Sequence, residues 1–99
     1  MIDEDFKMVK DELLKAMEKH PSFCDKFTKM NILYARQEEK MMKALNSTSP
    51  HFADQILLEE VAEARTAYIQ GDRQHCLEEL AQCGAVVLQM MELVRNEML

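Results

Sequence analysis

Two neighbouring stretches of this chain carry carboxylates on helix faces that are otherwise apolar, and they meet at a Gly-Asp pair. In the first stretch, the residues that fall within about 80° of one another on a helical wheel are Phe52, Ile56, Glu60, Glu63 and Ala67. In the second stretch, one stripe carries His75, Glu79, Gln82, Cys83, Val86, Met90 and Leu93. Because a buried carboxylate is costly unless it is paired or bound to a metal, this pattern constrains both fold and function.

Length and composition predict a single all-α domain over residues 1–99. Two glycines, two prolines and no tryptophan argue against a turn-rich β fold and favour long helices. A chain this short buries only a modest core, so oligomerisation would help to stabilise it. The formal net charge of −6 disfavours nucleic acid as a partner, because nucleic-acid binding needs a basic surface.

The cysteines and the apolar runs predict a cytoplasmic protein with no membrane partner. The chain has three cysteines, Cys24, Cys76 and Cys83, and no Cys-x-x-Cys motif. An odd number of cysteines without this motif is typical of reduced thiols. The N-terminus is acidic and amphipathic, unlike a signal peptide. The apolar run at 85–94 is too short to span a bilayer and suits the core of an oligomer.

Apolar periodicity and capping residues predict four helices. Residues 1–20 form an extra N-terminal helix and residues 22–98 supply the core helices. Ser22 is expected to cap the second helix, Ser49 is expected to cap the third, and Pro50 suits its first position. The predicted helices cover residues 3–19, 22–45, 50–70 and 73–97.

A tight turn is predicted between the third and fourth helices, with Gly71 ending one and Asp72 capping the next. Such a turn makes the two helices antiparallel neighbours and places Glu63 and Glu79 at matching distances from it. The third helix is apolar on nearly all sides, which in so small a protein implies burial against a second subunit. The expected architecture is an antiparallel helical bundle completed by oligomerisation.

The acids of these two helices have the spacing of a metal site. Glu59, Glu60 and Glu63 lie on adjacent turns of one face, and Glu79 and Gln82 are three residues apart on the next helix. Three or four oxygen ligands that converge between two helices suit Mg²⁺ or Mn²⁺. An ion of this kind can activate water for attack on a phosphoanhydride.

Other interpretations of the acids are weighed against this one. Spacing alone leaves open a solvated face on which the acids pair with Lys40, Arg65 and Arg73. A di-iron carboxylate centre needs Glu-x-x-His on two helices, and no Glu in this chain has a His three residues later. Zinc is disfavoured because no histidine shows ligand spacing with the cysteines.

The order of these motifs resembles that of the MazG-like all-α nucleoside triphosphate pyrophosphohydrolases. Their usual signature, Glu-Glu-x-x-Glu and later Glu-x-x-Asp, is similar to the Glu-Glu-x-x-Glu at 59–63 and the Glu-x-x-Gln at 79–82. The stretch at 35–40 resembles the Arg-Gln-x-x-Lys of a small, often phage-borne branch, and 79–86 resembles its Glu-Leu-x-Gln-x-Ala-Ala-Val. The resemblance covers roughly residues 34–94. Residues 1–30 lie outside it or align only weakly.

The resemblance implies a helical homodimer or homotetramer that uses Mg²⁺, or Mn²⁺, to hydrolyse an NTP or dNTP to the monophosphate and pyrophosphate. The metal ligands it implies are Glu60, Glu63, Glu79 and Gln82. Glu59 and Glu60 would be the catalytic residues, with Glu59 as a ligand or as the group that orients the attacking water. Arg36 and Lys40 would bind phosphates.

Gln82 departs from the family pattern, which has Asp at this position. A neutral amide offers one carbonyl oxygen but removes one negative charge, so metal affinity should drop. The alternative expectation is a catalytically weak or inactive helical module that binds a nucleotide or a protein on the same scaffold.

Overall fold

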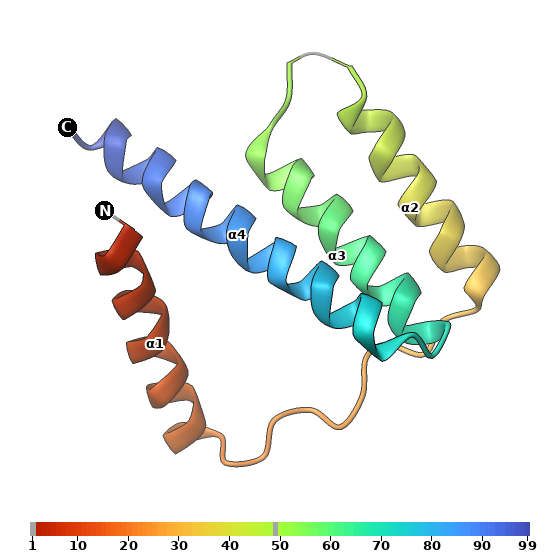
Figure 1. Cartoon of the computed structure of the whole chain (residues 1–99), viewed down its shortest axis with the longest axis horizontal. Coiled ribbons are helices and arrows are strands. Elements are labelled where there is room, and N and C mark those ends of the chain that lie inside the picture. The colour runs from red at the N-terminus through yellow and green to blue at the C-terminus, as the bar shows by residue number, and fades with distance from the viewer. Residues whose placement is uncertain (1, 49) are drawn as a thin grey trace.

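The computed structural model describes residues 2–48 and 50–99 and contains four helices, α1 (Ile2–Lys19), α2 (Ile32–Asn46), α3 (Ala53–Ile69) and α4 (Arg73–Glu97). Helix α3 packs antiparallel against both α2 and α4, whereas α1 contacts α4 and no other helix among the described residues (Figure 1). The molecule is a plate of 42 × 41 × 20 Å with α1 at one edge. The predicted all-α, four-helix fold is confirmed.

Within residues 2–48 and 50–99, no helix is both long enough and apolar enough to cross a membrane.

The limits predicted for the first and fourth helices are confirmed to within one residue, but the predicted start of the second helix is wrong. Helix α2 begins at Ile32, where the Asn31 side-chain oxygen accepts a hydrogen bond of 2.8 Å from the Leu33 N–H. Ser22 therefore does not cap this helix. Asn31 is the N-cap of α2, because its side chain accepts a hydrogen bond from one of the N–H groups that have no partner within the helix.

The segment over residues 20–31 is irregular, and one of its side chains contacts α3. Phe27, predicted to lie on the apolar stripe of the second helix, instead stacks on Tyr68 with ring centroids 4.3 Å apart and an interplanar angle of 5°. The Arg73 guanidinium lies 4.0 Å from the centroid of the same Tyr68 ring. This aromatic and cation–π contact ties the segment to the turn between α3 and α4.

The third helix also begins later than predicted. Helix α3 starts at Ala53, with Phe52 as its N-cap residue in an extended conformation, so Pro50 precedes the helix. The predicted cap Ser49 lies outside the described residues.

The turn between α3 and α4 is the one that the sequence predicts. Gly71 has φ +81°, its N–H donates to the Tyr68 carbonyl, and the Asp72 N–H donates to the Ala67 carbonyl, each at 3.0 Å. This pair of hydrogen bonds is a Schellman motif. The Asp72 side chain then accepts a hydrogen bond of 3.0 Å from the His75 N–H and caps α4.

Gly71→Ala is expected to lower the free energy of unfolding by about 1–2 kcal/mol, because a Cβ is strained in the left-handed region. Urea unfolding followed by circular dichroism measures this change. Gly71→Asn is the matched control and should lose less, since Asn tolerates positive φ. An alanine variant as stable as the wild type would contradict the prediction.

Candidate metal site and adjoining pocket

Three glutamates of α3 converge at its centre, on the side that the sequence predicts. Glu59, Glu60 and Glu63 are half-buried, and each offers a carboxylate oxygen that lies within 4.8 Å of the others. Helical spacing of three and four residues produces this convergence. The three side chains can hold a metal ion, and their hard oxygen atoms suit Mg²⁺ or Mn²⁺.

Helix α4 adds a fourth carboxylate, which is the most buried of the set. Glu79 is only 6% exposed, and its Oε1 lies 3.5 Å from His75 Nε2. Glu79 Oε2 and Glu60 Oε2 are both buried and have no hydrogen-bond partner. Because a buried carboxylate oxygen without a partner is costly, these two atoms fit a site that a cation neutralises.

Burial, and then the neighbouring carboxylates, raise the pKa of two of these acids. Burial raises the pKa of Glu63 from 4.5 to about 8, with further contributions from the neighbouring Glu79 carboxylate and from the charge of Glu60. Burial also raises the pKa of Glu60, followed by the negative charge of Glu79. The acids of α3 and α4 therefore form one electrostatic cluster, and we call Glu59, Glu60, Glu63 and Glu79 the acid cluster.

Lys43 of α2, which the sequence analysis did not single out, lies against this cluster. Its Nζ is 3.8 Å from Glu63 Oε1 and 3.5 Å from Glu39 Oε1. Burial would lower the Lys43 pKa, but the carboxylates of Glu39 and Glu63 more than offset this, so the pKa is raised. The ammonium group partly neutralises the acid cluster.

Asn46, also missed from the sequence, holds Glu59 in place. The Asn46 Nδ2 donates to Glu59 Oε1 and to the Gln55 carbonyl, each at 3.0 Å. Asn46 Oδ1 is buried and has no hydrogen-bond partner. A side chain at the last residue of α2 thereby fixes one carboxylate on α3, a contact that no local spacing rule predicts.

A polar pocket of about 310 Å³ adjoins the acid cluster and brings the two predicted phosphate-binding residues together. Arg36 and Lys40 line it from α2, as does Lys43, and Glu63 faces them from α3. His75 of α4 also lines this pocket. The α2 side of the pocket thus carries three cations and the acid Glu39, and a candidate metal ligand lines the α3 side.

The fourth predicted ligand, Gln82, is exposed on α4, whereas the neighbouring Cys83 is half-buried. Burial raises the pKa of the Cys83 thiol, followed by the negative charges of Glu60 and Glu79. Gln82 comes three residues after Glu79 and Cys83 comes four residues after it. Both residues therefore lie on the same face of α4 as Glu79.

Two of the three basic residues considered as salt-bridge partners for the acids, Arg65 and Arg73, pair elsewhere. Arg65 pairs with Glu38 of α2 at 3.0 Å, and Arg73 donates to the Tyr68 carbonyl at 2.8 Å. Neither neutralises the acid cluster.

Comparison with models of known protein families, with curated proteins and with solved structures gave no match for this chain. The case for any activity therefore rests on the residues themselves.

Proposed function

We propose that this protein is a Mg²⁺-dependent pyrophosphohydrolase that cleaves a nucleoside triphosphate, NTP or dNTP, to the monophosphate and pyrophosphate. The observation that carries the proposal is the acid cluster with its two unpartnered buried oxygens, beside a pocket lined by cations. The motif order of the MazG-like pyrophosphohydrolases supports the same reaction.

The residues of the acid cluster fit a hard divalent cation. Glu60 and Glu63, which belong to the converging group, would supply ligands together with the buried Glu79. The exposed Gln82 has the weakest case of the ligands implied by the resemblance. When bound, the cation supplies charge neutralisation for the triphosphate and lowers the pKa of water. In this proposal Glu59, whose Oε1 accepts a hydrogen bond from Asn46, takes the proton of the attacking water.

The pocket accounts for the binding of the phosphates. Arg36 presents a planar fork of donors and Lys40 a point charge to the phosphate oxygens. Attack of water on the α-phosphorus forms the new P–O bond, and the bond to the bridging oxygen breaks to release pyrophosphate.

A second candidate function is a module that binds a nucleotide or a protein without turnover. Lys43 favours it, because its ammonium group already lies 3.8 Å from Glu63 and competes with a metal ion for the same carboxylate. Gln82 in place of an acid favours it as well, since it removes a negative charge.

Calorimetric titration with Mg²⁺ and Mn²⁺ tests the choice, with and without a non-hydrolysable dNTP analogue. We expect metal binding that tightens in the presence of the nucleotide and weakens at least about tenfold in Glu63→Ala, because that variant loses one ligand. Glu38→Ala is the matched control, a half-buried acid that pairs with Arg65 outside the cluster.

The outcomes separate the two candidates. Metal-dependent release of pyrophosphate from any nucleoside triphosphate would dispose of the binding module. Nucleotide binding that needs Arg36 and Lys40 but no metal would overturn the hydrolase and favour the module.

A further inference from the structure

The three cations that α2 presents to the polar pocket differ in what they contact. Arg36, Lys40 and Lys43 follow one another at intervals of four and three residues, which places them on one face of the helix. Among the described residues, Arg36 and Lys40 form no ion pair with a carboxylate. Lys43 Nζ, in contrast, lies 3.5 Å from Glu39 Oε1 and 3.8 Å from Glu63 Oε1. Lys43 therefore belongs both to the pocket and to the surroundings of the acid cluster.

The charge of Lys43 acts on all three of the glutamates that converge on α3. Burial raises the pKa of Glu60 and of Glu63, and the positive charge of Lys43 opposes this rise in both. The charge of Glu59 adds to the raised pKa of Lys43, after burial, which opposes it, and nearer carboxylates, which support it. In the metal-free protein, one ammonium group thus serves as the counter-ion of the converging carboxylates.

The contacts of Lys43 are loose enough to exchange. Its side chain is 54% exposed, and both of its ion-pair distances exceed the roughly 2.7–2.9 Å of a charge-assisted hydrogen bond. Exposed ion pairs of this kind are weak. The flexible stem of a lysine also lets the ammonium group turn to another acceptor without a movement of the helix.

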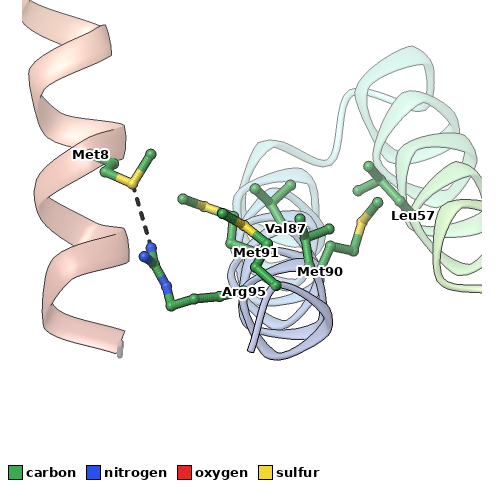
Figure 2. Close-up of a pocket in the computed structure, with 8 residues that line it drawn as sticks. Met8, Leu57, Val87, Met90, Met91 and Arg95 are labelled. Carbon is green, nitrogen blue, oxygen red and sulfur yellow. Dashed lines mark hydrogen bonds between the residues drawn. The ribbon is translucent and has the colours of Figure 1, made fainter.

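The cation that lines the apolar cavity of about 560 Å³ between α1 and α4 has the opposite character. Figure 2 shows Arg95 pointing from α4 toward Met8 of α1. Arg95 pairs with Asp5, which is only 1% exposed. Because removal of one partner would leave a buried charge uncompensated, this pair is costly to break. Arg95 is therefore fixed in place, whereas Lys43 has no buried partner of this kind.

A divalent cation at the acid cluster would repel the ammonium group of Lys43, because both would lie against the same carboxylate of Glu63. We propose that Lys43 is an exchangeable counter-ion, which neutralises the acid cluster in the metal-free protein and turns to a phosphate group in the pocket when a divalent cation takes its place. The inference rests on the metal and phosphate sites of the proposed function, and it names the residue that links them.

This exchange couples the two sites. A bound metal ion frees Lys43 for phosphate, and a bound phosphate draws Lys43 away from Glu63, so each ligand tightens the binding of the other by the same factor. Lys40, three residues earlier on the same face, is available to phosphate whether or not metal is present. The exchange thus assigns different roles to two lysines that line one pocket.

Calorimetric titration of the full chain tests the exchange, with Mg²⁺ alone, with inorganic phosphate alone and with each in the presence of the other. The titrations are run at pH 9, above the pKa of about 8 of Glu63, so that protons do not compete for this carboxylate. The test variant is Lys43→Met, which removes the charge and keeps an unbranched apolar side chain.

Lys43→Met should bind Mg²⁺ alone at least about threefold more tightly than the wild type, because a competitor for Glu63 is lost. Its affinity for phosphate alone should stay within about twofold of the wild type, since Lys43 is held by the acids when metal is absent. In the presence of Mg²⁺, its affinity for phosphate should be at least about threefold weaker than that of the wild type.

Lys40→Met is the matched control, because it removes the same charge from the same pocket without an ion pair to the acids. It should weaken phosphate binding both with and without Mg²⁺, and should leave the affinity for Mg²⁺ alone within about twofold of the wild type. Circular dichroism establishes that both variants keep the helical content of the wild type.

The outcomes separate the exchange from the proposed function. A Lys43→Met variant that binds Mg²⁺ no more tightly than the wild type, or that loses phosphate affinity equally with and without Mg²⁺, would overturn the exchange and leave the metal site in place. Failure of both the wild type and Lys43→Met to bind Mg²⁺ would overturn both proposals. The expected shifts in a protein that releases no pyrophosphate from any nucleoside triphosphate would support the exchange and overturn the hydrolase.

Discussion

Glu79→Gln is expected to lower metal-dependent hydrolysis of a nucleoside triphosphate at least about a hundredfold, while it raises the melting temperature of the metal-free protein. Hydrolysis falls because the most buried carboxylate of the acid cluster is lost as a ligand, and the metal supplies several kcal/mol to such a reaction. Stability rises because the amide removes one of the like charges that raise the pKa values of Glu60 and Glu63. Relief of 1 kcal/mol corresponds to about 4–8 °C in a domain of this size.

The opposite signs of the two effects make this prediction specific. Glu78→Gln is the control, since Glu78 is the exposed neighbour of Glu79 on α4 and should leave both quantities close to those of the wild type. Pyrophosphate release measures the rate of hydrolysis, and thermal unfolding in a chelating buffer measures the melting temperature of the metal-free protein. A variant that loses both activity and stability would assign Glu79 to the packing of α3 on α4 rather than to a metal.

Local rules predict the parts of the fold and site that depend on residues close in the chain. The third-to-fourth helix turn follows from Gly71 and Asp72, because one tolerates positive φ and the other caps a helix. That turn also brings Glu79 of α4 to the glutamates of α3, as the matching distances from the turn predict. Helical spacing then accounts for the convergence of Glu60 with Glu63.

The parts that the sequence does not predict depend on how the helices cross. Whether Gln82 or Cys83 approaches the acids is decided by the rotation of α4 against α3, which spacing leaves free. The pairing of Lys43 with Glu63 joins helices that a loop separates, so no periodicity encodes it. The stack of Phe27 on Tyr68 likewise replaces a predicted helix with an irregular segment.

The stability of the metal-free protein is expected to fall as the pH rises from about 5 to 8. Glu63 ionises at pH 4.5 in an ordinary setting and at about 8 in the fold. Between these values the folded chain binds a proton that the unfolded chain has released, so the stabilisation is complete below 4.5 and is lost as pH passes 8. Above that pH, the ionised carboxylate repels Glu60 and Glu79 unless a cation neutralises them.

Thermal unfolding between pH 5 and 9, with chelator and with Mg²⁺, checks this dependence. Without metal, the melting temperature should decline across the window by at least about 4–8 °C, the shift that corresponds to 1 kcal/mol. Added Mg²⁺ should restore more stability at pH 8.5 than at pH 6, because it competes with the proton on Glu63. Glu63→Gln should flatten both curves, whereas Glu12→Gln, an exposed acid on α1, should leave them unchanged. A wild-type protein that gains stability over this range would show that Glu63 ionises normally and that the acid cluster is open to solvent.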